Sequence, residues 1–200
     1  MQKLAFDIGC NIGKYTKKLL ENGWNVVAVD PNPYLFCGHI PGVIRVYAAC
    51  SNSIGNIPFY FSNTDTISTA SEFWVKESRF AGKHIWHKNE VPSTTIDELV
   101  KINGVPDHIK IDVEGYELIV LHGMTKKYAN EICFEWAEEQ GDDIKSCIDY
   151  LSSLGYSKFG FILGDEYLKE PEVYSGPAEF MDNFYYNKDR KDLWGMIWAK

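Results

Sequence analysis

The fold of this chain is decided by the stretch Leu4-Ala5-Phe6-Asp7-Ile8-Gly9-Cys10-Asn11-Ile12-Gly13. Its apolar run predicts a strand, which breaks into a glycine turn and leads into a helix predicted over residues 14–21. A second apolar run, residues 26–29, ends in Asp30. A strand, a glycine turn, a helix and a second strand ending in an acid are the parts of a nucleoside-binding half-site.

The spacing of the glycines distinguishes two classes of nucleoside ligand. Dinucleotide-binding proteins usually show Gly-x-Gly-x-x-Gly, which brings the backbone close to a pyrophosphate. Here the spacing is Asp7-x-Gly9-x-x-x-Gly13, with Asn11 in the middle. An acid at the mouth of the turn would repel a pyrophosphate, but it suits S-adenosylmethionine (SAM), which has an ammonium group, a ribose and no phosphate. An ordinary strand-to-helix turn is the alternative, and Asp30 favours SAM because its carboxylate can accept both ribose hydroxyls.

Composition limits the class of protein. The 200 residues are 45% apolar and 24% charged, which suits a single globular domain over residues 1–200. The net charge of −8 argues against a general nucleic-acid-binding protein. Apolar runs are too short for a membrane span and no signal-peptide pattern is present, so we expect a cytoplasmic protein. The five cysteines show neither close pairs nor zinc spacing, and we expect reduced, mostly buried thiols.

The first predicted strand begins near Lys3, with no helix before it. Either the N-terminus is minimal, or the chain is a domain cut from a longer polypeptide, for example one with a glycosyltransferase fused upstream. The second interpretation is slightly favoured.

Predicted strands and helices alternate along the rest of the chain. Further strands are predicted over residues 43–47, 57–61, 108–111, 131–134, 156–163 and 193–199, and helices over residues 96–102, 116–121 and 144–154. Pro58 indicates that its strand lies at an edge. The alternation predicts an α/β fold, with a mostly parallel sheet, helices on both faces and ligands at the carboxyl ends of the strands.

Two segments lack periodicity and are predicted to be irregular. Residues 62–89 contain several aromatic residues and histidines, and we expect a functional loop that forms a lid or an acceptor wall. A surface excursion is the alternative. Residues 164–192 are rich in charge, proline and aromatic residues, and they are predicted to be a second loop.

Four acids each follow or end a predicted strand: Asp7, Asp30, Asp112 and Glu135. Because the carboxyl ends of parallel strands meet at one edge of a sheet, we expect these side chains on one rim. Solvation alone does not explain such a placement.

These residues resemble the FkbM-type class I methyltransferases, which use SAM. The segments that carry the resemblance are Phe6 to Gly13, Asp30-Pro31-Asn32, residues 95–99, Ile109-Lys110-Ile111-Asp112-Val113-Glu114-Gly115-Tyr116-Glu117 and residues 121–124. It covers residues 4–136, and His122 stands where the family typically has lysine. The resemblance implies a Rossmann-like class I fold with a seven-stranded sheet. It also implies O-methylation of a hydroxyl on a carbohydrate, in a glycan or a glycosylated product.

The resemblance further implies which residues bind SAM. The methionine end would contact the first turn, the ribose would contact Asp30, and the adenine would lie near residues after the second and third strands. The residues assigned to the cofactor are Asp7, Gly9, Asn11, Gly13, Asp30, Pro31, Asn32, Ala49 and Asp112.

A sugar hydroxyl must lose its proton during methyl transfer, and two arrangements remain open. In the first, a side chain acts as general base, and the candidates are Asp112, Glu114, Glu135, His84 and His87. In the second, Asp112 and Glu135 bind Mg²⁺ or a similar divalent metal ion that polarises the acceptor. A third interpretation gives these acids only hydrogen-bonding roles.

Two other functional classes remain as alternatives. A nicotinamide-dependent oxidoreductase is disfavoured by the glycine spacing and by Asp7. A non-catalytic nucleoside-binding module is disfavoured by the acids at the strand ends. The expected partner is a carbohydrate or another small hydroxyl-bearing acceptor, and not a nucleic acid.

Overall fold

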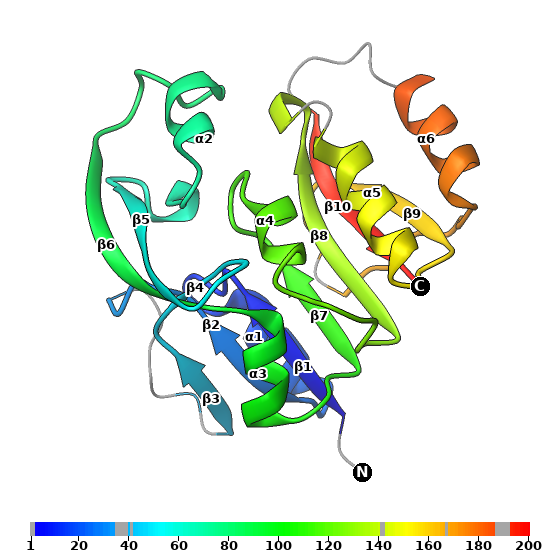
Figure 1. Cartoon of the computed structure of the whole chain (residues 1–200), viewed down its shortest axis with the longest axis horizontal. Coiled ribbons are helices and arrows are strands. Elements are labelled where there is room, and N and C mark those ends of the chain that lie inside the picture. Colours follow the sequence, from blue (N-terminus) through cyan, green and yellow to red (C-terminus); the bar gives the residue numbers. More distant parts are fainter. Residues whose placement is uncertain (1–2, 35–39, 41, 141–142, 167, 187–192) are drawn as a thin grey trace.

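The main sheet contains seven strands in the order β3-β2-β1-β7-β8-β10-β9 (Figure 1). The structure, a computed structural model, describes residues 3–34, 40, 42–140, 143–166, 168–186 and 193–200. The strands are β1 (Leu4–Ile8), β2 (Asn25–Val29), β3 (Val43–Val46), β7 (His108–Ile111), β8 (Glu131–Ala137), β9 (Phe159–Leu163) and β10 (Trp194–Ala199). Only β10 is antiparallel to its neighbours, so the predicted α/β fold with a mostly parallel seven-stranded sheet is confirmed.

Strand order reverses beside β1. The chain moves outward from β1 to β2 and β3, and it then returns to place β7 on the other side of β1. In open α/β sheets, ligands bind outside the carboxyl ends of the strands at such a reversal. The topology therefore locates a ligand crevice where β1, β2 and β7 end.

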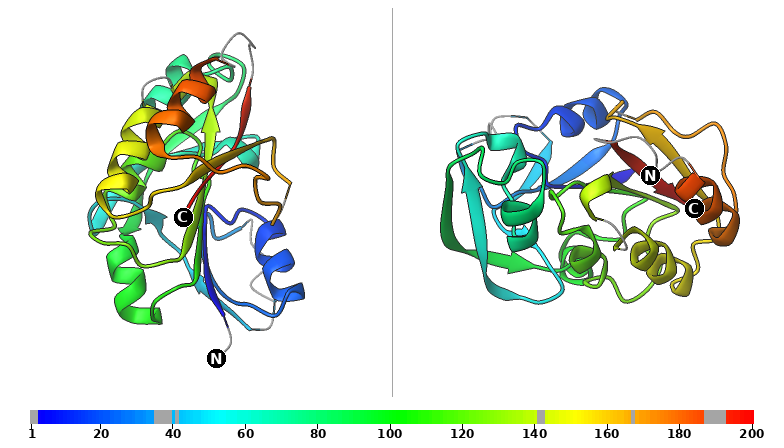
Figure 2. Two further views of the ribbon diagram at one scale, coloured as in Figure 1. Left: turned by 90° about the vertical axis from the view of Figure 1, so that its right-hand side faces the viewer. Right: turned by 90° about the horizontal axis from the view of Figure 1, so that it is seen from above.

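Helices cover both faces of the sheet (Figure 2). Helix α1 (Lys14–Glu21) lies on one face, and α3 (Ile96–Asn103), α4 (Glu117–Leu121) and α5 (Asp143–Ser153) lie on the other. The predicted cap of α3 is confirmed, since the Thr95 side chain accepts a hydrogen bond from the Glu98 amide at 3.1 Å. Among the described helices, none is long and apolar enough to cross a membrane.

A second, three-stranded sheet interrupts the alternation after β3. It consists of β4 (Ala49–Cys50), β6 (Trp86–Thr94) and β5 (Gly55–Ser62), in that order. The 3₁₀-helix η1 (Asp65–Ile67) and helix α2 (Glu72–Glu77) lie between β5 and β6. We call residues 49–94 the insertion. Figure 1 shows it beside the carboxyl ends of β1, β2 and β7.

The insertion is more regular than its sequence predicted. Strand β5 lies at the edge, as Pro58 indicated. The prediction of an irregular segment over residues 62–89 is wrong in part, because residues 72–77 are helical and β6 begins at Trp86. Most of the first half of β6 is exposed and shows no apolar alternation, so its strand structure depends on the ladder with β5. Such a ladder leaves no periodic signal in sequence.

The last third of the chain also differs from the prediction. Residues 177–186 form helix α6 (Pro177–Tyr186), within a segment predicted to be a loop. Phe180, Met181 and Phe184 are buried and have helical spacing, but the surrounding charged residues and prolines obscured it. Strand β8 also extends to Ala137, so Glu135 lies within it.

The cysteine prediction holds for the described part of the chain. Cys10, Cys50, Cys133 and Cys147 are free and buried. The fifth, Cys37, lies outside the described residues.

The turn after β1 predicts a large difference between two glycine substitutions. Gly9 and Gly82 both have positive φ, at +75° and +69°. A Cβ on Gly9 would lie 1.7 Å from the Asp112 carbonyl oxygen, whereas a Cβ on Gly82 would meet nothing within 4 Å. We expect G9A to lower the free energy of unfolding by at least about 2 kcal/mol more than G82A, measured by urea denaturation. Equal losses would contradict the close packing of this turn against β7.

Candidate functional site

A cavity of about 600 Å³ opens at the carboxyl ends of the parallel strands. Its volume lies in the range typical of small-molecule sites. Nine of the residues predicted to act in cofactor binding or catalysis line it: Gly9, Asn11, Asp30, Pro31, Asn32, Ala49, Asp112, Glu114 and Glu135. The fold therefore brings together most of the residues selected from the sequence.

Four predicted site residues do not line the cavity: Asp7, Gly13, His84 and His87. Asp7 is fully buried within β1 and does not line the cavity, so the prediction of an acid at its mouth is wrong. Its carboxylate accepts a hydrogen bond from the Thr16 hydroxyl of α1 at 2.5 Å. Gly13 has left-handed backbone geometry at the N-terminus of α1 and does not line the cavity. His87 is exposed on β6, away from the clustered acids, and this placement does not support its predicted role as general base.

Lys110 is the functional residue that sequence reasoning missed. Its ammonium lies 3.0 Å from Asp112 Oδ2 and 3.6 Å from Asp7 Oδ1, and it donates to the Gly9 carbonyl at 3.2 Å. Burial alone would lower the pKa of Lys110, but the charges of Asp112 and Asp7 raise it above its usual value. The sequence did contain a signal for Lys110, because a lysine between Ile109 and Ile111 in a buried strand indicates a buried charge.

Asp30 closes the first turn from the end of β2. Its two carboxylate oxygens accept hydrogen bonds from the backbone amides of Asn11, at 3.0 Å, and Asn32, at 2.8 Å. Burial raises the pKa of Asp30, and these two hydrogen bonds oppose the rise. Each oxygen can accept more than one hydrogen bond, so the side chain can still bind hydroxyl groups of a ligand.

The first turn also contacts the insertion. The Asn11 side chain donates to the Asp65 carbonyl at 3.1 Å, which joins the turn to η1. On the far side, Arg79 forms a two-pronged ion pair with Glu139, at 2.5 Å and 2.7 Å. Glu139 lies in the 3₁₀-helix η2 (Glu138–Gln140), directly after β8. The insertion is therefore attached to both the first turn and the segment after β8, and it forms one wall of the cavity.

Aromatic side chains contribute to this wall. Trp74 and Phe80 line the cavity from the insertion, as residues 62–89 were predicted to do. Trp194 lines it from β10, and Asp165, in the segment after Gly164, also faces it. Both segments that the sequence predicted to be irregular thus reach the cavity.

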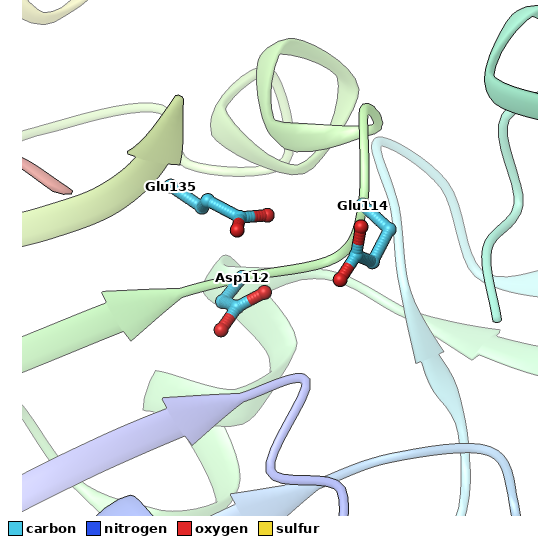
Figure 3. Close-up of side chains that lie close together, drawn as sticks. All are labelled: Asp112, Glu114 and Glu135. Carbon is cyan, nitrogen blue, oxygen red and sulfur yellow. The ribbon is translucent and has the colours of Figure 1, made fainter. Parts of the chain in front are cut away.

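Three carboxylates gather at one end of the cavity (Figure 3). Asp112, Glu114 and Glu135 each offer an oxygen, and these oxygens lie within 4.8 Å of one another. Asp112 directly follows β7, Glu114 lies in the loop to α4, and Glu135 comes from the adjacent strand β8. We call these three side chains the carboxylate cluster.

The electrostatics of the carboxylate cluster are unfavourable for three ionised acids. Burial, followed by the charge of Asp112, raises the pKa of both Glu114 and Glu135 well above the usual range. Glu135 is 8% exposed, and its Oε2 has no hydrogen-bond partner among the described residues. Such groups are well suited to accept a proton near neutral pH or to bind a cation.

Glu114 has strained backbone geometry. Its φ of +58° is left-handed, which costs a residue with a side chain about 1–2 kcal/mol. The Thr69 hydroxyl, in the insertion, contacts the Glu114 and Val113 carbonyl oxygens, at 2.8 Å and 3.2 Å. A Cβ on the following Gly115 would lie 2.8 Å from the Trp74 ring, so a side chain there would clash. The surroundings therefore hold the Glu114 carboxylate in the cluster despite the strain.

Comparison with known proteins bears on this site. The chain matches the family described as "Methyltransferase FkbM domain" over residues 7–158. It is 32% identical over 134 residues to the hexuronic acid methyltransferase AglP of Haloferax volcanii. That alignment covers 61% of this chain and 50% of AglP, so the chain matches about half the length of this relative.

Two solved structures align with the whole of this chain at low sequence identity. A SAM-dependent methyltransferase from Archaeoglobus fulgidus is 15% identical with a TM-score of 0.46, covering 100% of this chain and 86% of that chain. Precorrin 8w decarboxylase from Methanobacterium thermoautotrophicum is 14% identical with a TM-score of 0.46, covering 100% of this chain and 82% of that chain.

The buried ion pair of Lys110 predicts strong coupling between two substitutions. Lys110→Met would leave the carboxylate of Asp7 buried beside no cation, and we expect the free energy of unfolding to fall by about 3–5 kcal/mol. Adding Asp7→Asn removes that charge and should restore part of the loss. Lys101→Met, on the exposed face of α3, is the matched control and should have little effect. Urea denaturation of Lys110→Met, Asp7→Asn, the double variant and Lys101→Met would refute the coupling if the losses of the two single variants were simply additive.

Proposed function

The chain belongs to the FkbM methyltransferase family, and from this premise we propose that it transfers a methyl group from SAM to a hydroxyl oxygen of a carbohydrate. The proposal rests on one observation: Asp30 and the carboxylate cluster line the same cavity. An acidic cavity disfavours phosphate groups but suits a ligand with a positive sulfonium and a positive ammonium group. The similarity to a hexuronic acid methyltransferase supports a sugar as acceptor.

The residues around the first turn fit SAM. Asp30 would accept hydrogen bonds from the ribose hydroxyls, because both of its oxygens retain acceptor capacity. The turn from Gly9 to Asn11 would contact the methionine end, and Asn32 and Ala49 would lie near the adenine. Because Asp7 is buried behind this turn, the methionine ammonium would depend on other acceptors, of which the Asp112 carboxylate is the candidate.

SAM supplies a methyl group on a sulfonium sulfur, and the carbon–sulfur bond breaks with its electron pair as the acceptor oxygen bonds to the methyl carbon. The protein must align that oxygen and remove its proton. Glu114 and Glu135 are the proposed proton acceptors, since burial and neighbouring charge raise the pKa of each carboxyl. Lys110 is proposed to hold Asp112 in place through its ion pair. The insertion would orient the sugar through Trp74 and Phe80.

The cofactor proposal predicts a loss of binding in one variant. Asp30→Ala should weaken the affinity for S-adenosylhomocysteine at least about tenfold, because the ribose loses its carboxylate partner. Isothermal titration calorimetry measures this, with Asp149→Ala, an exposed carboxylate of α5, as control. A thermal-shift screen should show stabilisation by S-adenosylhomocysteine and none by NAD or ATP. Stabilisation by NAD alone would instead support the nicotinamide-dependent oxidoreductase.

The proton-transfer proposal predicts a loss of activity without a loss of cofactor binding. Glu135→Gln should lower methyl transfer from labelled SAM to a hexuronic-acid-containing oligosaccharide about 100-fold or more, while the affinity for S-adenosylhomocysteine stays the same. Glu77→Gln, an exposed glutamate of α2, is the matched control. Full activity of Glu135→Gln would rule out Glu135 as the proton acceptor.

A further inference from the structure

We propose that the carboxylate cluster of Asp112, Glu114 and Glu135 binds one divalent metal ion at the inner end of the cavity. The catalytic role of this ion rests on the proposed function, whereas its binding does not. The sequence suggested only Asp112 and Glu135 as ligands, and the fold adds Glu114 from the loop after β7.

The spacing of the three oxygens fits a hard cation. Divalent ions that prefer oxygen have metal–oxygen distances between about 2.1 Å for Mg²⁺ and about 2.4 Å for Ca²⁺. Two ligands on opposite sides of such an ion are therefore about 4.2–4.8 Å apart. The oxygens of the cluster all lie within 4.8 Å of one another. The cluster therefore has a span that a single oxygen-preferring ion can bridge.

The clearest sign of a missing partner is Glu135. Its Oε2 is buried without a hydrogen-bond partner in the described part of the chain, on a residue that is only 8% exposed. Figure 3 shows its carboxylate directed toward the space between Asp112 and Glu114. A buried carboxylate oxygen is expensive to leave unpaired, and a cation in this space would satisfy it.

Charge balance leads to the same assignment. The three carboxyl groups face one nearby ammonium among the described residues, that of Lys110, which lies 3.0 Å from Asp112 and is shared with the buried Asp7. The guanidinium of Arg79 is already paired with Glu139. Acidic groups therefore outnumber basic groups around this space, which favours a bound cation.

The backbone geometry at Glu114 supports its assignment as the third ligand. Glu114 has a φ of +58°, a geometry that glycine would adopt without strain. Backbone strain of this kind is typical of functional sites, where the surrounding contacts maintain it. Thr69 supplies such contacts from the insertion. Thr69 thus links the position of the insertion to the position of the third ligand, Glu114.

An ion with three protein ligands retains open coordination positions. Acceptor hydroxyls can fill them, which would orient the sugar and make its hydroxyl easier to deprotonate.

Mn²⁺ alone tests the binding, with no cofactor or acceptor present. Titration of the whole chain, followed by the electron paramagnetic resonance signal of free Mn²⁺, should show one site that Mg²⁺ competes for. Glu135→Gln and Glu114→Gly should each weaken Mn²⁺ at least about tenfold. Glu114→Gly relieves the left-handed strain, so its loss of binding cannot be attributed to unfolding. Glu77→Gln should bind as the unmodified chain does.

Two results would overturn the assignment: no Mn²⁺ binding below millimolar concentration, or binding that survives both cluster substitutions. A second arm addresses the catalytic role. Methyl transfer should fall at least about tenfold in EDTA and recover with Mg²⁺. Transfer that persists in EDTA refutes the role of the ion and leaves the methyltransferase proposal intact. If the chain binds Mn²⁺ but transfers no methyl group, the metal site stands and the methyltransferase proposal is refuted.

Discussion

The site depends on a single buried cation. Lys110 lies between Asp7 on β1 and Asp112 at the end of β7, and it also contacts the carbonyl of Gly9. These contacts hold the first turn against the neighbouring strand at the point where strand order reverses. Because a buried ion pair is expensive to break, the turn and the carboxylate cluster have a fixed relative position. The cavity is thus preorganised on its sheet side.

Most of the fold was predictable from local and periodic signals in the sequence. The first turn, α1, the parallel strands and the cap of α3 were predictable because each depends on residues close together in sequence. The prediction failed where a partner far along the chain supplies the structure. Strand β6 exists because β5 pairs with it, and its exposed half gives no apolar pattern. Helix α6 buries only a few aromatic side chains within a polar segment.

The site residues also divide into those that the sequence predicted and those that depend on partners far along the chain. The strand-end acids Asp30, Asp112 and Glu135 line the cavity as parallel topology required. Asp7 was misplaced because it lies within β1, one residue before the strand ends, where its carboxylate contacts Thr16 of α1 and Lys110 of β7. Only the fold shows that Lys110 is the cation beside it. The strain at Glu114 has no signal in sequence, since glycine would have marked it and glutamate does not.

The insertion has a consequence for how relatives could diverge. Strands β5 and β6 pair along eight residues with each other, and side-chain contacts attach the insertion to the rest of the structure. Loops and hairpins supported in this way tolerate change better than the elements that carry them. The wall that this hairpin contributes to the cavity is therefore a replaceable module. Under the proposed function, exchange of the hairpin between relatives offers a route to new sugar specificities.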